Sequence, residues 1–266
     1  AAAEYSLGKR ADIEISFDRT TAISVKPGRP LPEEDFELWA VYFPIGLGDA
    51  DVVAITQARE LRKFIAREKN NLPLQSLGPF RNTPLLTELI IDTNGEITAE
   101  DCEVVASLSL LEKLGFGASI APIADLSRLL SPPKLHTLSF NQRLRPEDGS
   151  ILNRFPNLRT LNIGGSKNGD LISELSDLDK IEELILSFTT VTAANLEALN
   201  ENLKQTLVKL QFGRAEVDSS AAVDVAIRRF PNLENFFPRG KISPEILLKL
   251  SALKELKSLT LNQAAT

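Results

Sequence analysis

Two successive stretches, LRTLNIGGSKNGDLISELSDLDK (residues 158–180) and IEELILSFTTVTAANLEALNENLKQT (residues 181–206), open in the same way. Each begins with an apolar residue, followed by two residues, leucine, one residue and a further apolar residue. The fourth and sixth positions alternate with mainly polar residues, which is the period of a strand with one buried face. In the second stretch Thr192, a preferred helix N-cap, then precedes an apolar helical stripe. One strand followed by one short helix is therefore the predicted unit.

The apolar triplet recurs ten times between position 38 and the C-terminus, at intervals of 23 to 26 residues. The ten triplets are Leu38-Val41-Phe43, Leu61-Phe64-Ala66, Leu86-Leu89-Ile91, Leu111-Leu114-Phe116, Leu135-Leu138-Phe140, Leu158-Leu161-Ile163, Ile181-Leu184-Leu186, Leu207-Leu210-Phe212, Leu233-Phe236-Pro238 and Leu256-Leu259-Leu261. A single unit cannot bury both its apolar faces, whereas stacked copies can. At about 1.5–3 kcal/mol for each fully buried leucine, the shared core dominates stability. The sequence therefore predicts an α/β solenoid with a parallel concave sheet and short convex helices.

Over about residues 36–266 these units resemble the leucine-rich-repeat family, whose signature is LxxLxL. The convex segments are similar to the ITDAGL type of ribonuclease-inhibitor-like repeats: ITAEDCEVVASL (97–108), VTAANLEALNENL (191–203), VDSSAAVDVAI (217–227) and ISPEILLKLSAL (242–253). Their expected N-caps are Thr98, Thr192, Asp218 and Ser243. The resemblance implies a horseshoe that binds other molecules on its concave face. One departure is position 9, where the family has asparagine: only Asn94 keeps it, so a continuous asparagine ladder is excluded.

The two ends differ from the repeat. In residues 1–35, ADIEISF (11–17) and TAISV (21–25) alternate around the turn DRTT, which predicts a hairpin that caps the first repeat. The lead-in, with AAAEYSLGKRADIEI and LPEEDFELWAVYF, looks like that of repeat regions in large bacterial multidomain proteins, some with Ser/Thr kinase domains. At the other end the chain stops after a repeat strand. We expect further repeats there or an uncapped edge able to self-associate.

Composition limits the classes of function. With 266 residues, 43% of them hydrophobic, the chain can bury a substantial core, and its net charge of −6 disfavours nucleic acid as a partner. No apolar run reaches about 18 residues, so no membrane span is expected. The compartment stays open: a soluble cytoplasmic or extracytoplasmic part of a larger bacterial protein is expected. Cys102 is the only cysteine, so neither an internal disulfide nor a cysteine-built metal site is expected.

Candidate chemistry is sparse. His136 is the only histidine and has no evident nucleophile partner, and Cys102 falls on the apolar stripe of its helix, which predicts a core thiol. The segment NIGGSKNGD (162–170) lacks the spacing of a phosphate-binding loop and occupies a repeat turn. No catalytic residue, metal or cofactor is therefore expected.

The concave sheet is the expected site, because positions 3, 5 and 7 of each unit point away from the core. A mixed aromatic and arginine strip is the first candidate, and such residues are frequent in interface hot spots; it comprises Ile185, Phe188, Gln211, Arg214, Phe237 and Arg239. A weaker second patch comprises Trp39, Tyr42, Arg62, Lys63 and Arg67. Alternatively, Phe188 and Phe237 pack on neighbouring repeats, and Trp39 packs under the hairpin. Glycines at position 7, such as Gly213, either leave room for a ligand or relax a bend.

The sequence thus predicts a non-enzymatic module that binds a protein or peptide through its concave sheet. The main alternative is the ligand-sensing region of a larger signalling protein, such as a membrane-anchored bacterial Ser/Thr kinase. A self-associating structural repeat is a third possibility.

Overall fold

Strands and short helices alternate along the chain, as the predicted unit requires. The computed structural model describes all residues except 9, 44–47, 67–75, 92–96, 118–128, 141–143, 145–147, 165–169, 188, 214–218 and 262–266. The strands are β1 (Asp12–Ser16), β2 (Ile23–Val25), β3 (Glu37–Phe43), β4 (Lys63–Ala66), β5 (Glu88–Ile91), β6 (Lys113–Phe116), β7 (Thr137–Phe140), β8 (Thr160–Ile163), β9 (Glu183–Ser187), β10 (Lys209–Gly213), β11 (Asn235–Pro238) and β12 (Ser258–Leu259). The helices are α1 (Ala2–Gly8), α2 (Asp49–Ile55), η1 (Gly78–Asn82), α3 (Ala99–Ser107), α4 (Asp148–Leu152), α5 (Asp170–Ser173), α6 (Ala193–Glu197), α7 (Leu203–Thr206), α8 (Ser220–Arg229), α9 (Pro244–Lys249) and η3 (Leu250–Ala252). They form two compact units, Ala1–Leu135 and His136–Thr266.

In the second unit the predicted triplets stack in register. Strands β7 to β12 follow one another in chain order, and each pairs in parallel with the next. Position 4 of one repeat lies opposite position 4 of the next repeat, as Leu138, Leu161 and Leu184 show. These three leucines are at most 1% exposed, whereas the residues on either side of each leucine, at positions 3 and 5 of its repeat, are half-buried. The predicted solenoid of stacked strand-and-helix units is confirmed.

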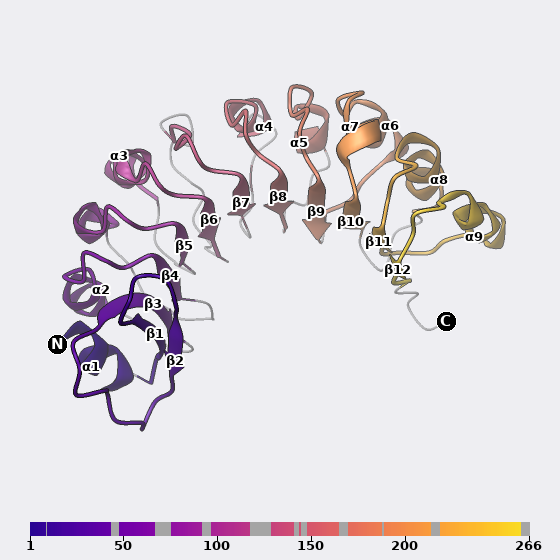
Figure 1. Ribbon diagram of the computed structural model, residues 1–266. Coiled ribbons are helices and arrows are strands. Elements are labelled where there is room, and N and C mark those ends of the chain that lie inside the picture. The colour runs from indigo at the N-terminus through magenta and orange to yellow at the C-terminus, as the bar shows by residue number, and fades with distance from the viewer. Residues whose placement is uncertain are drawn as a thin grey trace. The chain divides into compact units, whose positions relative to one another are not determined.

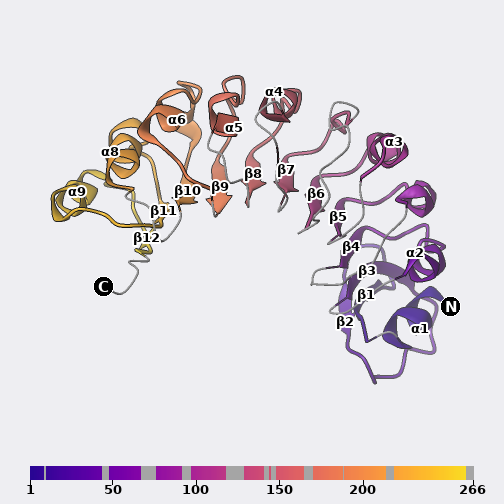
Figure 2. The same ribbon diagram turned by 180° about the vertical axis from the view of Figure 1, so that it is seen from behind.

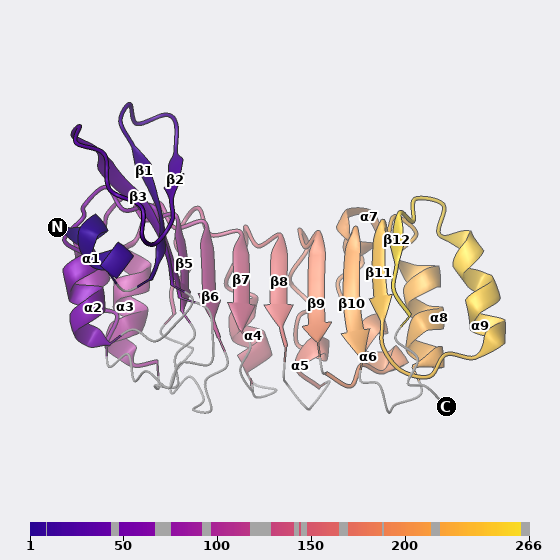
Figure 3. The same ribbon diagram turned by 90° about the horizontal axis from the view of Figure 1, so that it is seen from below.

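Helices cover only one face of the second unit's sheet. Figure 1 and, from behind, Figure 2 show α4, α5, α6, α8 and α9 on one side of strands β7 to β12. Figure 3 shows the same strands side by side with the helices behind them. The opposite side, called the open face below, carries no described helix.

The first unit adds a hairpin to the same arrangement. Strands β3 to β6 are parallel, and β1 joins them by pairing antiparallel with both β2 and β3. The predicted N-terminal hairpin is therefore present, and it extends the sheet beyond β3. Helix α1 was not predicted; the Tyr5 hydroxyl donates to buried Asp51 of α2 and ties the two helices together.

Phenylalanine rings fill the core between strands and helices in each unit. Phe64 lies 5.9 Å from Phe43 and 4.9 Å from Phe80 between ring centroids, and Phe212 lies 5.8 Å from Phe236. All five rings are at most 3% exposed. Edge-to-face and tilted pairs at such distances stabilise beyond the area they bury.

A backbone ladder joins successive units just before each strand. The carbonyl of His136 accepts hydrogen bonds from the amides of both Arg159 and Thr160, at 2.8 and 3.0 Å. The carbonyls of Arg159 and Glu182 each accept two amides of the next unit in the same way. This pattern satisfies the backbone without any particular side chain, so variable residues are tolerated there.

Buried polar residues at the helix starts also connect neighbouring units. Thr98, the expected N-cap of α3, forms a capping box with Asp101, and Asp101 also accepts a hydrogen bond from the amide of Leu77 at 2.6 Å. Thr192 and Asn195 form the same box at α6, and Asn195 donates to Ser173 Oγ at 3.1 Å. Side chains of the capping boxes therefore make inter-unit bonds without the family's asparagine ladder.

The other two expected helix starts are partly confirmed. Ser243 is the N-cap of α9, and Pro244 follows at the first helical position. The N-cap of α8 is Ser219, one residue after the expected Asp218, which lies outside the described residues.

The helix of the last repeat, α9, is less buried than the helices of the repeats before it. The helical stripe buries Cys102, Leu196 and Ala222 at 1%, 0% and 2% exposure, whereas Leu247 at the corresponding position of α9 is only half-buried. Helix α9 buries none of its residues, and Leu248 is 78% exposed, because no helix of a later repeat packs against α9 in the described chain. Self-association through this edge stays a prediction.

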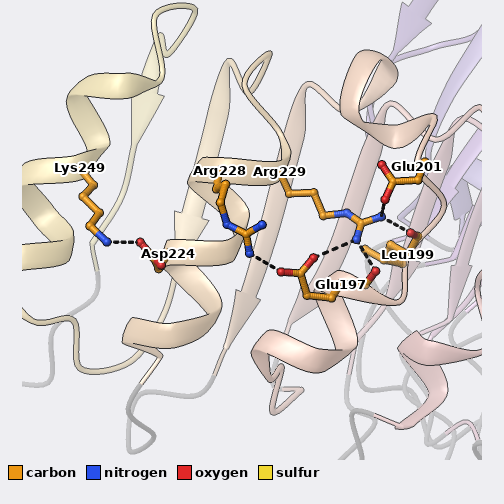
Figure 4. Close-up of polar contacts among 7 residues, drawn as sticks. All are labelled: Glu197, Leu199, Glu201, Asp224, Arg228, Arg229 and Lys249. Atoms are coloured by element: carbon orange, nitrogen blue, oxygen red, sulfur yellow. Dashed lines mark hydrogen bonds and ion pairs between the residues drawn. The ribbon is translucent and has the colours of Figure 1, made fainter.

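Charged side chains link the helices of the second unit (Figure 4). The Glu197 carboxylate accepts hydrogen bonds from Arg228 and from Arg229 Nη1, the latter at 3.2 Å, and Lys249 pairs with Asp224 at 2.5 Å. The hydrogen bond from Arg228 is the main reason why the pKa of Glu197 lies below its ordinary value of 4.5, while burial opposes the shift. A lowered pKa in the folded state means that this stabilisation is present above pH 4.5 and is lost on acidification.

Replacing Glu197 by glutamine is expected to remove this pH-dependent stabilisation. The variant should unfold at a lower urea concentration than the unsubstituted chain at neutral pH. The difference between the two should shrink as the pH falls below 4.5, because the carboxylate of the unsubstituted chain then becomes neutral. Urea unfolding followed by circular dichroism at each pH measures the difference. A gap that stays constant over this range would contradict the assignment.

Candidate functional site

Three predicted residues lie side by side on the open face of the second unit. Gln211 of β10 is in register with Ile185 of β9 on one side and with Phe237 of β11 on the other. All three occupy position 5 of their units and are half-buried, while the position 4 and 6 residues beside them are buried. Neighbouring strands lie about 4.8 Å apart, so the three side chains span about 10 Å. Ile185, Gln211 and Phe237 are called the central strip below.

The amide in the middle of the central strip is held by a neighbour. Gln211 Nε2 donates to Ser187 Oγ at 2.7 Å. Ser187 sits at position 7 of the preceding repeat and was not singled out from the sequence, although the register places it diagonally across from Gln211, opposite Gly213. The hydrogen bond orients the amide between two apolar side chains, where it can bind polar groups such as those of a peptide backbone.

An ion pair borders the central strip. Position 3 of each repeat lies two residues before the strip residue on the same strand. At this position Lys209 Nζ lies 2.9 Å from Glu183 Oε2. The two residues are in register on β10 and β9. Their side chains are 30% and 38% exposed, so both charges lie at the surface of the open face. Asn235 continues this row on β11 without charge.

Of the other three members of the first candidate, the structure describes only Arg239. Phe188 and Arg214 lie outside the described residues. Arg239 follows β11; its amide donates to Phe212 O at 2.8 Å, and its carbonyl accepts from Ser219 Oγ at 2.8 Å. Its backbone is thus part of the fold, and its side chain is half-buried.

Gly213 at position 7 serves the backbone. It has a φ of +98°, and a Cβ placed on it would lie 2.1 Å from the carbonyl oxygen of Arg239. The space beside this glycine is therefore filled by the next unit. The interpretation that it leaves room for a ligand is wrong at this position, and the one that it relaxes the backbone is supported.

The second patch separates into two groups of contacts. Trp39 is only 9% exposed, and the guanidinium carbon of Arg62 lies 4.0 Å from its ring centroid. The indole Nε1 donates to Glu37 at 3.2 Å, and this hydrogen bond is the main cause of the lowered pKa of Glu37. Trp39 is thus engaged within the fold, covered by Arg62. Arg67 lies outside the described residues.

The other group surrounds Glu14 of β1. The Tyr42 hydroxyl donates to Glu14 Oε1 at 2.8 Å, and Lys63 Nζ lies 3.7 Å from Glu14 Oε2. Burial, and next the hydrogen bond to Glu14, raise the pKa of Tyr42, so the phenol stays protonated and donates. The hairpin therefore supplies the partner of both residues, a contact between distant segments that the sequence did not indicate.

The candidate chemical residues have structural surroundings. Cys102 is 1% exposed in α3, as expected of a core thiol. His136 is half-buried, with Nδ1 3.1 Å from Thr137 Oγ1. Within the described part of the chain, His, Cys, Asp and Glu side chains form no group of three that could hold a metal ion. No helix among the described residues has the length and apolarity needed to cross a bilayer.

Comparison with solved structures identifies the fold. The internalin InlF of Listeria monocytogenes is similar, with a TM-score of 0.50 and 19% identity over 81% of this chain and 65% of the internalin. An internalin C2 of the same organism has a TM-score of 0.45 and 17% identity, covering 84% and 80% of the two chains. A leucine-rich-repeat protein of Leptospira interrogans has a TM-score of 0.44 and 20% identity, covering 79% and 57%.

The chain therefore spans less than two thirds of the length of InlF. No protein-family model matches the sequence, and no curated protein does. The chain has the leucine-rich-repeat fold, an α/β solenoid, and the similarity to InlF shows that fold alone.

Proposed function

We propose that this chain is a non-enzymatic module that binds a protein or peptide through the open face of its second unit. The central strip Ile185, Gln211 and Phe237 is the proposed centre of the contact. The observation that carries the proposal is the register of three neighbouring strands, which aligns two apolar side chains and an oriented amide where no described helix covers them.

The composition of the central strip supports an interface. Aromatic and apolar side chains flanked by polar groups are typical of hot spots, which need only a few residues. A standard interface buries about 800 Å² on each partner, an area that several adjacent strands can offer. Arg239 at the end of β11 belongs to the proposed border of the contact.

Two finer expectations are kept as predictions. One is the ribonuclease-inhibitor-like type of the repeats. The other is that the chain is the ligand-sensing region of a larger bacterial signalling protein.

Removing both apolar side chains of the central strip tests the proposal. Peptides of about ten residues would be selected from a displayed random library on the unsubstituted chain, since about eight extended residues match the roughly 24 Å width of six strands. The double variant Ile185→Ala/Phe237→Ala is expected to bind the selected peptides at least about tenfold more weakly, because both anchors lose buried apolar area. Fluorescence polarisation with labelled peptides measures the affinities.

The matched control truncates two exposed leucines elsewhere. Leu130 and Leu248 are 63% and 78% exposed and neither belongs to the strip, so Leu130→Ala/Leu248→Ala removes exposed apolar surface without changing the strip. This variant should bind normally, and circular dichroism should show both variants folded. Equal binding by the strip variant and the unsubstituted chain would refute the proposed site.

A further inference from the structure

Charges at the start of the second unit's strands cancel in pairs across the sheet. At positions 2 and 3 of these strands there are three acidic residues and three lysines or arginines. Each forms an ion pair with the adjacent unit, and the pairs are Arg159–Glu182, Glu183–Lys209 at 2.9 Å and Glu234–Lys257 at 2.9 Å. A chain with a net charge of −6 is thus locally neutral along the start of these strands.

The first unit shows the same pattern independently. Along position 3, Lys63 of β4 lies 3.7 Å from Glu14, and Lys113 of β6 lies 3.8 Å from Glu88 of β5. Acidic and basic side chains alternate in register from β4 to β6. Internal neutralisation is therefore found among the strands of both units rather than in one chance contact.

Paired charges favour an uncharged ligand. Lys209 Nζ and Glu183 Oε2 are 2.9 Å apart, so a ligand carboxylate that approaches Lys209 also comes close to the Glu183 carboxylate. A ligand ammonium that approaches Glu183 likewise comes close to the Lys209 ammonium. Attraction to one partner is offset by repulsion from the other, and removing water from the pair adds a further cost. An uncharged segment that covers Ile185 and Phe237 and leaves the ion pair in water avoids both penalties.

We infer that the occupant of the central strip is an uncharged, largely apolar segment of polypeptide, with backbone amides facing Gln211. This inference rests on the proposed function and specifies the chemistry of its partner. Discrimination against acidic and basic segments follows from the Glu183–Lys209 pair, which lies directly beside the strip.

The selected peptides test this chemistry directly. They should lack acidic and basic residues at their central positions, and their affinities should change less than about threefold between about 50 mM and 500 mM NaCl. Inserting one aspartate or one lysine at the centre of a selected peptide should weaken binding at least about tenfold. The double variant Glu183→Gln/Lys209→Gln removes both charges and keeps a polar side chain at each position, so it should bind the uncharged peptide within about threefold.

The outcomes separate the two proposals. If selected peptides depend on Ile185 and Phe237 but need a central acidic or basic residue, with a loss above about tenfold on its neutral replacement, the inference is wrong and the proposed function stands. If no selected peptide depends on Ile185 and Phe237, both are wrong. Salt-insensitive, strip-dependent binding that tolerates the double glutamine variant supports both.

Discussion

Gly213→Ala is expected to destabilise the second unit by at least about 3 kcal/mol, measured as a lower midpoint of urea unfolding. The added Cβ would lie 2.1 Å from Arg239 O and 3.0 Å from Arg239 C, so two backbone segments must separate. The φ of +98° adds conformational strain for any residue with a side chain. Both costs fall at the junction of β10 and the turn after β11.

Gly28 offers a matched control in the turn that follows β2. It also has a positive φ, +80°, but a Cβ there would meet no atom within 4 Å. Gly28→Ala should therefore cost only the conformational term, about 1 kcal/mol. If Gly213→Ala is no more destabilising than Gly28→Ala, the close approach to Arg239 does not limit this position.

The repeat could be predicted from the sequence because its driving force is local and periodic. Leu161 and Leu184 occupy the same position in successive units, and the structure pairs them directly. Capping residues such as Thr98 and Thr192 act within one turn of their own helix, so their role is visible in a short window of sequence.

Contacts between neighbouring repeats, or between the N-terminal segment and the repeats, could not be predicted in the same way. The hydrogen bonds of Tyr5 to Asp51 and of Leu77 to Asp101 join segments of separate elements, and neither follows from an apolar period. Helix α1 occurs once, before the repeats, so comparing the repeats with one another could not reveal it. Leu247 has an apolar position in its helix yet is only half-buried, because burial there depends on a neighbouring helix and not on the sequence of α9 itself.

The candidate site was predictable to the same limit. Position 5 of each unit faces away from the core, so the alignment of Ile185, Gln211 and Phe237 follows from the repeat alone. Which side chains are already engaged does not follow from it. Trp39 under Arg62 and Tyr42 on Glu14 are fixed by side-chain packing, which one sequence does not reveal.

Arg229→Ala is expected to destabilise the second unit by about 3 kcal/mol, although the residue lies among surface helices. Its side chain is only 7% exposed, and its guanidinium donates to the carbonyls of Glu197 and Leu199 at the end of α6 (Figure 4). Nη1 lies 3.2 Å from the Glu197 carboxylate, and Nη2 lies 3.4 Å from that of Glu201. Removing the guanidinium leaves the buried carbonyl of Leu199 and the part-buried carbonyl of Glu197 without this donor, which is costlier than losing an exposed pair.

The adjacent Arg228 provides the control for this prediction. It pairs with the same carboxylate of Glu197, but its side chain is 63% exposed and it makes none of the carbonyl contacts described for Arg229. Arg228→Ala should therefore cost less than about 1 kcal/mol, as exposed ion pairs do. Urea unfolding of both variants at neutral pH compares the two arginines on one helix and against one partner. Similar losses for both would mean that the carbonyl contacts of Arg229 contribute little, and that its burial reflects packing of its aliphatic stem.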